Sequence, residues 1–163
     1  MTIFLIGMMG SGKTTVGKEL ASQLNLKFID SDYLIENKEG LTIKEIFKSK
    51  GETYFRHLES KVLQDIIESE EDCVIACGGG LPIHKNNLVD CLENGKVFYL
   101  KAPSEVLFER IYSDHTRPML KDFENFKQLL LHRDSFYEKA HFIIDGTKNT
   151  KEICTEILGK LFF

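Results

Sequence analysis

Arginine is scarce in this sequence: the 163 residues include 17 lysines but only four arginines, Arg56, Arg110, Arg117 and Arg133. Acidic residues outnumber basic ones by 25 to 21, which gives a formal net charge of −4. We therefore expect no broad basic surface of the kind that binds nucleic acid. Because a guanidinium is a planar, two-pronged fork and an ammonium is not, we expect each arginine to lie where such a fork is needed.

The four cysteines are also few and scattered, with no CxxC pair and no histidine at zinc-finger spacing. Neither a disulfide framework nor a metal site is indicated, and Cys73 and Cys77 are expected to be small core residues. The sequence has no long hydrophobic run and no positively charged leader, so we expect no membrane contact and a reducing, cytoplasmic location. With 42% hydrophobic and 28% charged residues, the composition predicts one globular domain over residues 1–163.

Short apolar runs alternate with helical patterns from end to end, which is typical of a parallel sheet covered by helices. We expect five strands, at residues 2–6, 27–30, 72–76, 96–100 and 141–145. Two apolar stripes at helical spacing lie between them, one of Val16, Leu20 and Leu24, the other of Phe55, Leu58, Val62 and Ile66. The least regular stretch, around residues 112–121, is polar and predicts either a plain connector or a lid over a site.

Helix starts are marked at three further places. Thr42 with Glu45, and Asn149 with Glu152, have the spacing of a capping box, in which side chain and backbone cap each other. Pro103 suits the first turn of a helix.

Residues 7–14 read GMMGSGKT and match the pattern GxxxxGK[ST] directly after a strand and before a helix. The glycines let the backbone amides of the loop converge on phosphate oxygens, and the N-terminus of the following helix favours an anion. Lys13 adds a positive charge, and the Thr14 hydroxyl can ligate Mg²⁺. The alternative is a merely structural glycine turn. The motif in this context predicts a nucleotide phosphate site.

Other classes of phosphate-loop protein fit less well. No aspartate is followed by glycine three residues later, and Asn37-Lys38 leads into Glu39-Gly40, so the GTPase motifs DxxG and NKxD are missing. A translocating ATPase would carry a carboxylate at the end of its central strand, where this chain has residues 77–80, Cys-Gly-Gly-Gly. A GTPase and a motor ATPase are therefore disfavoured.

Two carboxylates, Asp30 and Asp32, stand at the predicted end of the second strand, an edge where open α/β sheets bind ligands. If the strand extends through both, they point the same way. One could then hold a metal ion, directly or through water, and the other could accept a proton from an attacking hydroxyl. The competing interpretation is that one of them only caps the following helix.

Arginines occupy unexpected places in the helical patterns. Arg133 falls inside the apolar stripe of a helix predicted over 122–139, where a substrate carboxylate or phosphate could be its anionic partner. Alternatively it pairs with an internal acid or extends to solvent at the edge of the stripe. Arg56 has Glu59 three residues on to orient it, although an exposed salt bridge would look the same. Arg117 in the predicted lid could close on a transferring phosphoryl group. Arg110 could reach the nucleotide or simply favour a helix C-terminus.

Taken together, these motifs resemble the shikimate kinases over essentially the whole chain. The resemblance rests on residues 7–14, Asp30-Ser31-Asp32, Phe55-Arg56 with Glu59, Gly78-Gly79-Gly80, residues 117–120, and Arg133 with Tyr137 and Ala140. It implies a three-layer α/β fold of the phosphate-loop kinase type, with a five-stranded parallel sheet in the order 2-3-1-4-5, a lid at about 112–121 and a substrate-binding region at about 31–60. It also implies transfer of the ATP γ-phosphoryl group to the 3-hydroxyl of shikimate, on the route to chorismate and aromatic amino acids.

The resemblance assigns roles to individual residues. ATP would be bound by Gly10, Ser11, Gly12, Lys13, Thr14, Thr15, Arg110 and Arg117, and Mg²⁺ by Thr14 and, through water, Asp30. Shikimate would be bound by Asp32, Arg56, Gly78, Gly79, Gly80 and Arg133. Lys13, Asp32 and Arg117 would be catalytic. The expected partners are these small molecules alone, and the expected state is a monomer.

Two alternatives stay open at this point. A gluconate-type kinase shares the phosphate loop and a substrate aspartate, but its pattern has a histidine soon after that aspartate, and none occurs here between Asp32 and His57. A nucleotide-binding regulatory module without turnover would be favoured if Lys13, Asp32 or the carboxylate-binding arginines were missing, and all are present.

Overall fold

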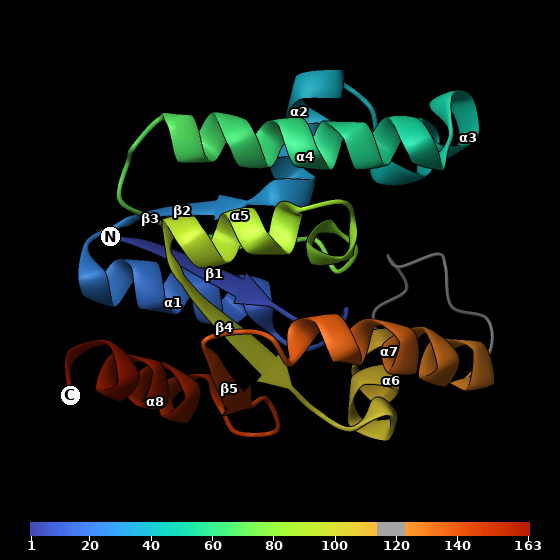
Figure 1. Ribbon diagram of the computed structural model, residues 1–163. Coiled ribbons are helices and arrows are strands. Elements are labelled where there is room, and N and C mark those ends of the chain that lie inside the picture. Colours follow the sequence, from blue (N-terminus) through green and yellow to red (C-terminus); the bar gives the residue numbers. More distant parts are fainter. Residues whose placement is uncertain (114–122) are drawn as a thin grey trace.

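The computed structural model describes residues 1–113 and 123–163, and these form a five-stranded, wholly parallel sheet in the order β2-β3-β1-β4-β5 (Figure 1). The strands are β1 (Thr2–Ile6), β2 (Lys27–Asp30), β3 (Cys73–Ala76), β4 (Lys96–Lys101) and β5 (Phe142–Asp145). The predicted order is confirmed, and every strand is found within one residue of its predicted bounds. Asp72 lies just before β3, where its carboxylate pairs with the N-terminal amino group of Met1.

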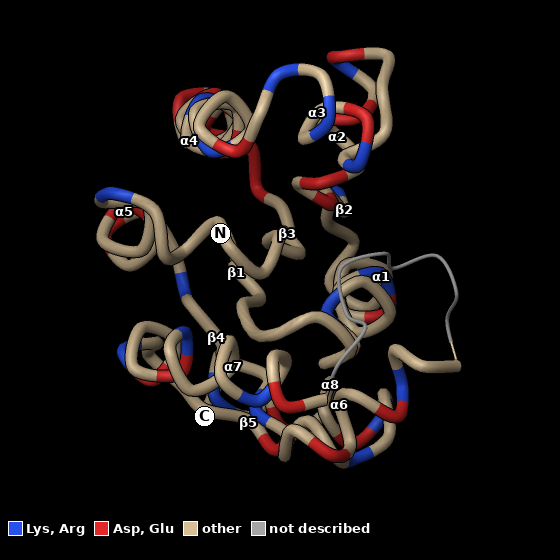
Figure 2. The backbone as a smooth tube through the Cα atoms, turned by 90° about the vertical axis from the view of Figure 1, so that its right-hand side faces the viewer, with Lys and Arg blue, Asp and Glu red and all other residues tan. Residues whose placement is uncertain are grey.

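Helices cover both faces of the sheet and complete the predicted three layers. One face packs against α1 (Lys13–Leu24) and α8 (Thr150–Phe162). The other packs mainly against α4 (Glu52–Glu68), α5 (Asn87–Asn94), α6 (Ser104–Tyr112) and α7 (Phe123–Tyr137). The remaining elements are α2 (Ser31–Glu39), α3 (Ile43–Lys50) and the short 3₁₀ helix η1 (Leu81–Ile83). In Figure 2 the tube through β1 carries no charged residue, whereas the helices around it carry many, as expected for a central buried strand.

Local sequence signals account for several helix boundaries. The capping boxes at Thr42 and Asn149 are both present, at the starts of α3 and α8. Pro103 is the residue before α6 and not inside its first turn, so that prediction was wrong by one position. The two predicted apolar stripes face the core, with Val16, Leu20, Phe55, Val62 and Ile66 buried and Leu24 and Leu58 partly so.

The cysteines behave as predicted. All four are buried and unpaired. Burial raises the pKa of the Cys73 thiol, which therefore stays protonated and unreactive at neutral pH. Among the residues that the structure describes, no helix is both long and apolar enough to cross a lipid bilayer.

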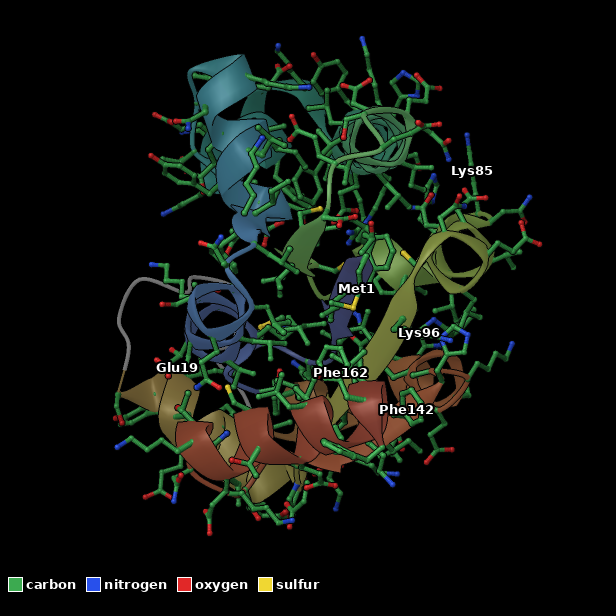
Figure 3. All side chains as sticks on the ribbon, turned by 90° about the vertical axis from the view of Figure 1, so that its left-hand side faces the viewer. Met1, Glu19, Lys85, Lys96, Phe142 and Phe162 are labelled. Atoms are coloured by element: carbon green, nitrogen blue, oxygen red, sulfur yellow. The ribbon has the colours of Figure 1, made fainter. Side chains whose placement is uncertain are left out.

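Because all strands are parallel, their carboxyl ends share one edge of the sheet, and the predicted site segments follow them there. Residues 7–14 follow β1, Ser31 and Asp32 follow β2, and residues 77–80 follow β3. Figure 3 shows the opposite edge, where Met1, Lys96 and Phe142 mark the beginnings of β1, β4 and β5. Among the described residues, none of the predicted site residues belongs to that edge. The predicted lid with Arg117 lies outside the described residues, apart from Tyr112 and Ser113.

Candidate active site

The phosphate loop connects β1 to α1 in a conformation that depends on glycine. Gly10 and Gly12 have φ angles of 84° and 90°, in the left-handed region that other residues rarely adopt. Gly12 is also the N-cap of α1, and because it has no side chain it makes no capping hydrogen bond. The first amides of α1 are therefore left for an anion, as a phosphate site requires.

Lys13 folds back over this loop. Its Nζ atom donates to the carbonyl oxygens of Gly7 and Met8 at 2.8 and 3.0 Å. The ammonium is thereby held beside the loop, and Lys13 is placed where a phosphate bound in the loop would meet its charge.

Asp30 caps the following helix, which confirms one of the two interpretations of its position, while its role in holding a metal ion stays a prediction. Its Oδ1 atom accepts hydrogen bonds from the amides of Asp32 and Tyr33 at 3.1 and 3.2 Å, which caps α2. Its Oδ2 atom accepts from the Thr14 hydroxyl at 2.8 Å. A carboxylate and a hydroxyl oxygen thus meet beside the phosphate loop.

These two oxygens fit Mg²⁺, which takes oxygen ligands and is commonly held by one or two protein groups together with substrate phosphates and water. No cluster of three or more His, Cys, Asp or Glu side chains suited to a metal occurs within the described residues. The Thr14 hydroxyl and the Asp30 carboxylate are the kinds of oxygen donor that such a site uses.

Asp32 does not share an extended strand with Asp30, so the predicted reason for their common direction was wrong. The strand ends at Asp30, and Asp32 lies in the first turn of α2. The helix turn nevertheless brings its carboxylate against the next strand end, because a β-carbon placed on Gly78 would lie only 2.5 Å from Asp32 Oδ1. Asp32 is thus directed to the glycine turn after β3.

Each of the three glycines in this turn faces one predicted substrate-binding side chain. A β-carbon on Gly79 would lie 3.0 Å from Arg133 Nη1, and one on Gly80 would lie 2.1 Å from Arg56 Nη1. A β-carbon on Gly80 would displace the end of Arg56, and one on Gly79 would press closely on Arg133. The turn therefore brings together Asp32 from α2, Arg56 from α4 and Arg133 from α7, three helices far apart in the sequence.

Arg56 is oriented by a buried acid, as its spacing predicts. Its Nη1 atom donates to Glu59 Oε2 at 2.7 Å, and its Nη2 atom lies 3.4 Å from Glu52 Oε1. Burial raises the pKa of Glu59 to about 7, although the charge and hydrogen bond of Arg56 act in the opposite direction. With 17% of its side chain exposed, Arg56 is more than an exposed salt bridge on a helix surface.

Arg133 lies beside the buried ring of Tyr137 and near the phosphate loop. Its Nη1 atom is 3.8 Å from the sulfur of Met8. Burial raises the pKa of Tyr137 to about 12, and the neighbouring guanidinium opposes that rise. Arg133 therefore stands between the glycine turn and the phosphate loop.

Arg110 joins two loops at the nucleotide side of the sheet. Its Nη1 and Nη2 atoms donate to the carbonyl oxygens of Gly10 and Gly146 at 3.2 and 3.0 Å. It connects the phosphate loop with the turn after β5, so both halves of its fork are used. The contact with a nucleotide stays a prediction, as does the role of Arg117, which lies outside the described residues.

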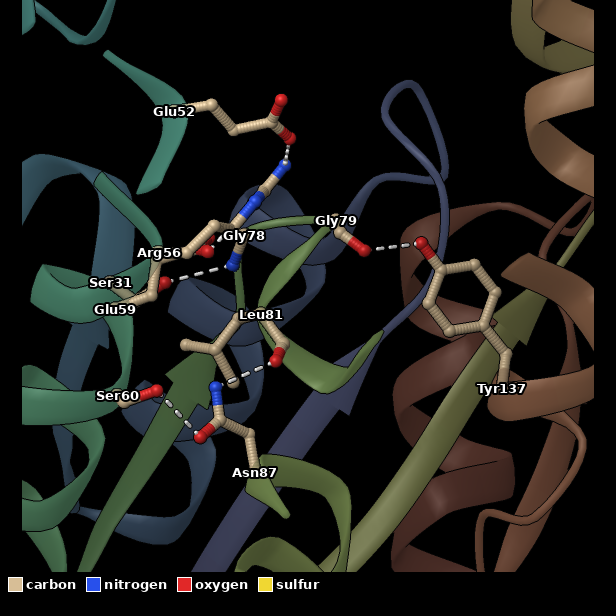
Figure 4. A network of polar contacts seen from close by, with 10 residues as sticks. All are labelled: Ser31, Glu52, Arg56, Glu59, Ser60, Gly78, Gly79, Leu81, Asn87 and Tyr137. Carbon is tan, nitrogen blue, oxygen red and sulfur yellow. Dashed lines mark hydrogen bonds and ion pairs between the residues drawn. The ribbon is translucent and has the colours of Figure 1, made fainter. Parts of the chain in front are cut away.

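Sequence reasoning missed two hydroxyls in this site. Ser31 accepts a hydrogen bond from the amide of Gly78 at 2.8 Å, and Tyr137 donates to the carbonyl of Gly79 at 2.6 Å (Figure 4). Both side chains are buried. Ser31 and Tyr137 stood in the motifs that suggested the family, but nothing in their spacing indicated a contact with the turn.

Comparison with known proteins identifies the family of this chain. A family model described as shikimate kinase matches residues 9–162. A shikimate kinase from Sulfurihydrogenibium sp. is 45% identical over 161 residues, which cover 98% of this chain and 96% of the relative. The crystal structure of shikimate kinase from Aquifex aeolicus has a TM-score of 0.89 at 41% identity, covering 99% of this chain and 96% of the other.

A shikimate kinase from Acinetobacter baumannii in complex with shikimate is similar as well. Its TM-score is 0.91 at 38% identity, over 98% of this chain and 92% of the other. A gluconokinase from Sinorhizobium meliloti has a TM-score of 0.62 at only 20% identity, which shows a common fold and no more. Both the family model and the close relatives extend over nearly the whole sequence, and this chain belongs to the shikimate kinase family.

Proposed function

We propose that this protein transfers the γ-phosphoryl group of ATP to the 3-hydroxyl of shikimate, giving shikimate 3-phosphate and ADP on the route to chorismate and aromatic amino acids. The observation that carries the proposal is the convergence of Asp32, Arg56 and Arg133 on a glycine turn beside the phosphate loop. Two guanidiniums and one carboxylate complement a small molecule that has one carboxylate and several hydroxyls.

The substrate side of the site would work as a clamp. Arg56 and Arg133 bind the shikimate carboxylate, while Gly78, Gly79 and Gly80 let the backbone approach the ring. Glu59 holds the Arg56 fork from one side. This arrangement fixes the ring so that one hydroxyl faces the phosphate loop, and such positioning supplies much of the rate in phosphoryl transfer.

The nucleotide side uses the phosphate loop. Gly10, Ser11, Gly12, Lys13, Thr14 and Thr15 bind the ATP phosphates, with Arg110 near the nucleotide at the turn that contains Gly146. Thr14 and, through water, Asp30 hold Mg²⁺, which when bound neutralises phosphate charge. Lys13 stabilises the charge that develops on the transferring group.

Asp32 is the group that acts on the attacking hydroxyl. It binds the shikimate hydroxyls, orients the 3-hydroxyl and accepts its proton as the new oxygen–phosphorus bond forms. The bond between the γ-phosphorus and its bridging oxygen breaks at the same time, and ADP leaves with the electron pair. Arg117 closes over the phosphates and excludes water.

The remaining attributes belong to the same proposal. Residues 1–163 act as one kinase domain, with a lid at about 112–121 and a substrate region at about 31–60. The protein works as a cytoplasmic monomer on small molecules, without nucleic-acid or membrane partners.

The test is release of ADP by purified protein with Mg-ATP. ADP should appear when shikimate is added and not with gluconate alone, and ³¹P NMR should show a new phosphomonoester on the shikimate ring. The same measurement without Mg²⁺ should give no product. Absence of shikimate-dependent ADP release between pH 6 and 9 would refute the proposal and favour the silent nucleotide-binding module.

A further inference from the structure

Most backbone N–H and C=O groups of the glycine turn after β3 have a hydrogen-bond partner within the protein. The carbonyls of Gly78 and Gly80 accept from the amides of Leu81 and Ile83 at 3.0 and 3.1 Å. The amide of Gly78 donates to Ser31 Oγ, and the carbonyl of Gly79 accepts from the Tyr137 hydroxyl (Figure 4). Within the described part of the chain, the amides of Gly79 and Gly80 are the two backbone donors of this glycine turn that no protein group uses.

The two glycines that carry these amides face the two guanidiniums, since a β-carbon on Gly79 would meet Arg133 and one on Gly80 would meet Arg56. An anion held by the arginines would therefore lie next to these two glycines. Ser31 removes the third amide, that of Gly78, from this set. The turn thus offers two backbone amides, those of Gly79 and Gly80, to an anion. They can bind it only while the backbone of the turn keeps this conformation.

Ser31 and Tyr137 reach the turn from opposite sides, as Figure 4 shows. Ser31 opens α2 and directly precedes Asp32, and Tyr137 lies one helical turn after Arg133 on α7. The two hydroxyls therefore tie the turn to the helices that carry two of its three facing side chains. They fix the spacing from Asp32 to the turn and from the turn to Arg133.

We propose that Ser31 and Tyr137 are positioning residues, which hold the turn so that the amides of Gly79 and Gly80 and the side chains of Asp32 and Arg133 meet one shikimate molecule. The inference rests on the proposed function. The competing explanation is that the hydroxyls only satisfy buried backbone groups and contribute to stability alone.

The two explanations differ in which kinetic constant changes. Tyr137→Phe keeps the buried ring and removes one hydroxyl, and Ser31→Ala removes the other. If the residues position the turn, each variant raises the KM for shikimate by about 10-fold and leaves the KM for ATP within about 2-fold, the size expected for one buried hydrogen bond. Because both act on the same turn, the double variant should lose less than the product of the two effects.

Tyr99→Phe is the matched control. Tyr99 is also buried, its ring centroid lies 5.1 Å from that of Tyr137, and its hydroxyl donates a bond of 2.6 Å to Asp134, which keeps Lys101 as a second partner. This variant removes a comparable hydroxyl without touching the glycine turn. It should lower the melting temperature by an amount similar to Tyr137→Phe and leave the KM for shikimate within about 2-fold.

Wild-type protein is assayed first, so that the two proposals fail separately. Lack of shikimate turnover by the wild type refutes the proposed function, and the inference falls with it. With an active wild type, unchanged shikimate KM in folded Tyr137→Phe and Ser31→Ala overturns the inference alone. Equal rises of both KM values, or a Tyr99→Phe variant that reproduces the shikimate effect, overturn it as well.

Discussion

Replacing Gly80 by alanine should displace the Arg56 guanidinium and little else. The new β-carbon would lie 2.1, 2.6 and 2.7 Å from Nη1, Cζ and Nη2 of Arg56, whereas ordinary contacts begin near 3.4 Å. The φ angle of Gly80 is −87°, which alanine adopts without strain. The three nearest atoms all belong to the end of a flexible side chain, which must move by more than about 1 Å, a displacement that can cost about 100-fold at a reacting site.

The expected result is a KM for shikimate about 100-fold higher, with the KM for ATP within about 2-fold. Because moving the fork weakens the 2.7 Å pair with buried Glu59, the free energy of unfolding should fall by about 1–3 kcal/mol, which is visible as a lower melting temperature. Steady-state kinetics and thermal denaturation measure the two effects.

Two comparisons decide whether Arg56 transmits the effect. Gly159→Ala, in α8 with open space around the new β-carbon, should leave both KM values unchanged and stabilise the protein by about 0.5–1 kcal/mol. In an Arg56→Ala background, Gly80→Ala should add almost nothing to the shikimate KM. An undiminished effect in that background, or a normal shikimate KM in folded Gly80→Ala, would show that the reasoning about Arg56 is wrong.

Three further predictions concern the same site. Arg133→Lys should weaken shikimate binding by about 10- to 100-fold and ATP binding far less, because a fork becomes a point charge, and equal losses in titration calorimetry would contradict this. Asp32→Asn should lower kcat by about 100-fold or more with an unchanged melting temperature, whereas near-normal kcat would mean that Asp32 only belongs to the helix start. Burial raises the pKa of Glu59 to about 7, and the carboxylate of bound shikimate should raise that pKa further. Because shikimate binding is then accompanied by uptake of a proton, shikimate affinity should increase as pH falls from 8 to 6. In Glu59→Gln, shikimate affinity should not change over this pH range.

The fold was predictable because its signals are local. Apolar runs of four to six residues and capping residues depend on neighbours in the sequence, so strand bounds and the helix starts at Thr42 and Asn149 are confirmed. Pro103 shows the limit of such signals. A proline at the first helical position and one just before it look alike in sequence, since both suit its fixed φ angle.

The sequence indicated which residues meet at the glycine turn, but it did not indicate how they are arranged there. The direction of Asp32 depends on whether β2 continues past Asp30, and the cap that Asp30 itself forms starts α2 at Ser31 instead. The contacts of Ser31 and Tyr137 join residues 47 and 58 positions apart from their partners. No regular sequence spacing predicts a hydrogen bond between residues so far apart, so a three-dimensional structure is needed to find these contacts.

The use of arginine has a physical reason at two of the three described positions. Arg56 and Arg110 use the two ends of the fork on different partners, Glu59 and Glu52 in one case and the carbonyls of Gly10 and Gly146 in the other. Lysines such as Lys38 and Lys148 pair with single carboxylates at the surface, where a point charge suffices.

Net charge alone would hold a substrate carboxylate poorly at this turn. Arg56 and Arg133 stand beside the carboxylate of Asp32 and the carboxyl group of Glu59, whose pKa of about 7 leaves it partly charged, so the acids offset part of the positive charge. Attraction must then come from directed hydrogen bonds, for which the guanidinium has a fixed plane and the ammonium does not. The same reasoning explains why glycines face these side chains: directed contacts need the arginines in one place, and a β-carbon on Gly79 or Gly80 would press on Arg133 or Arg56.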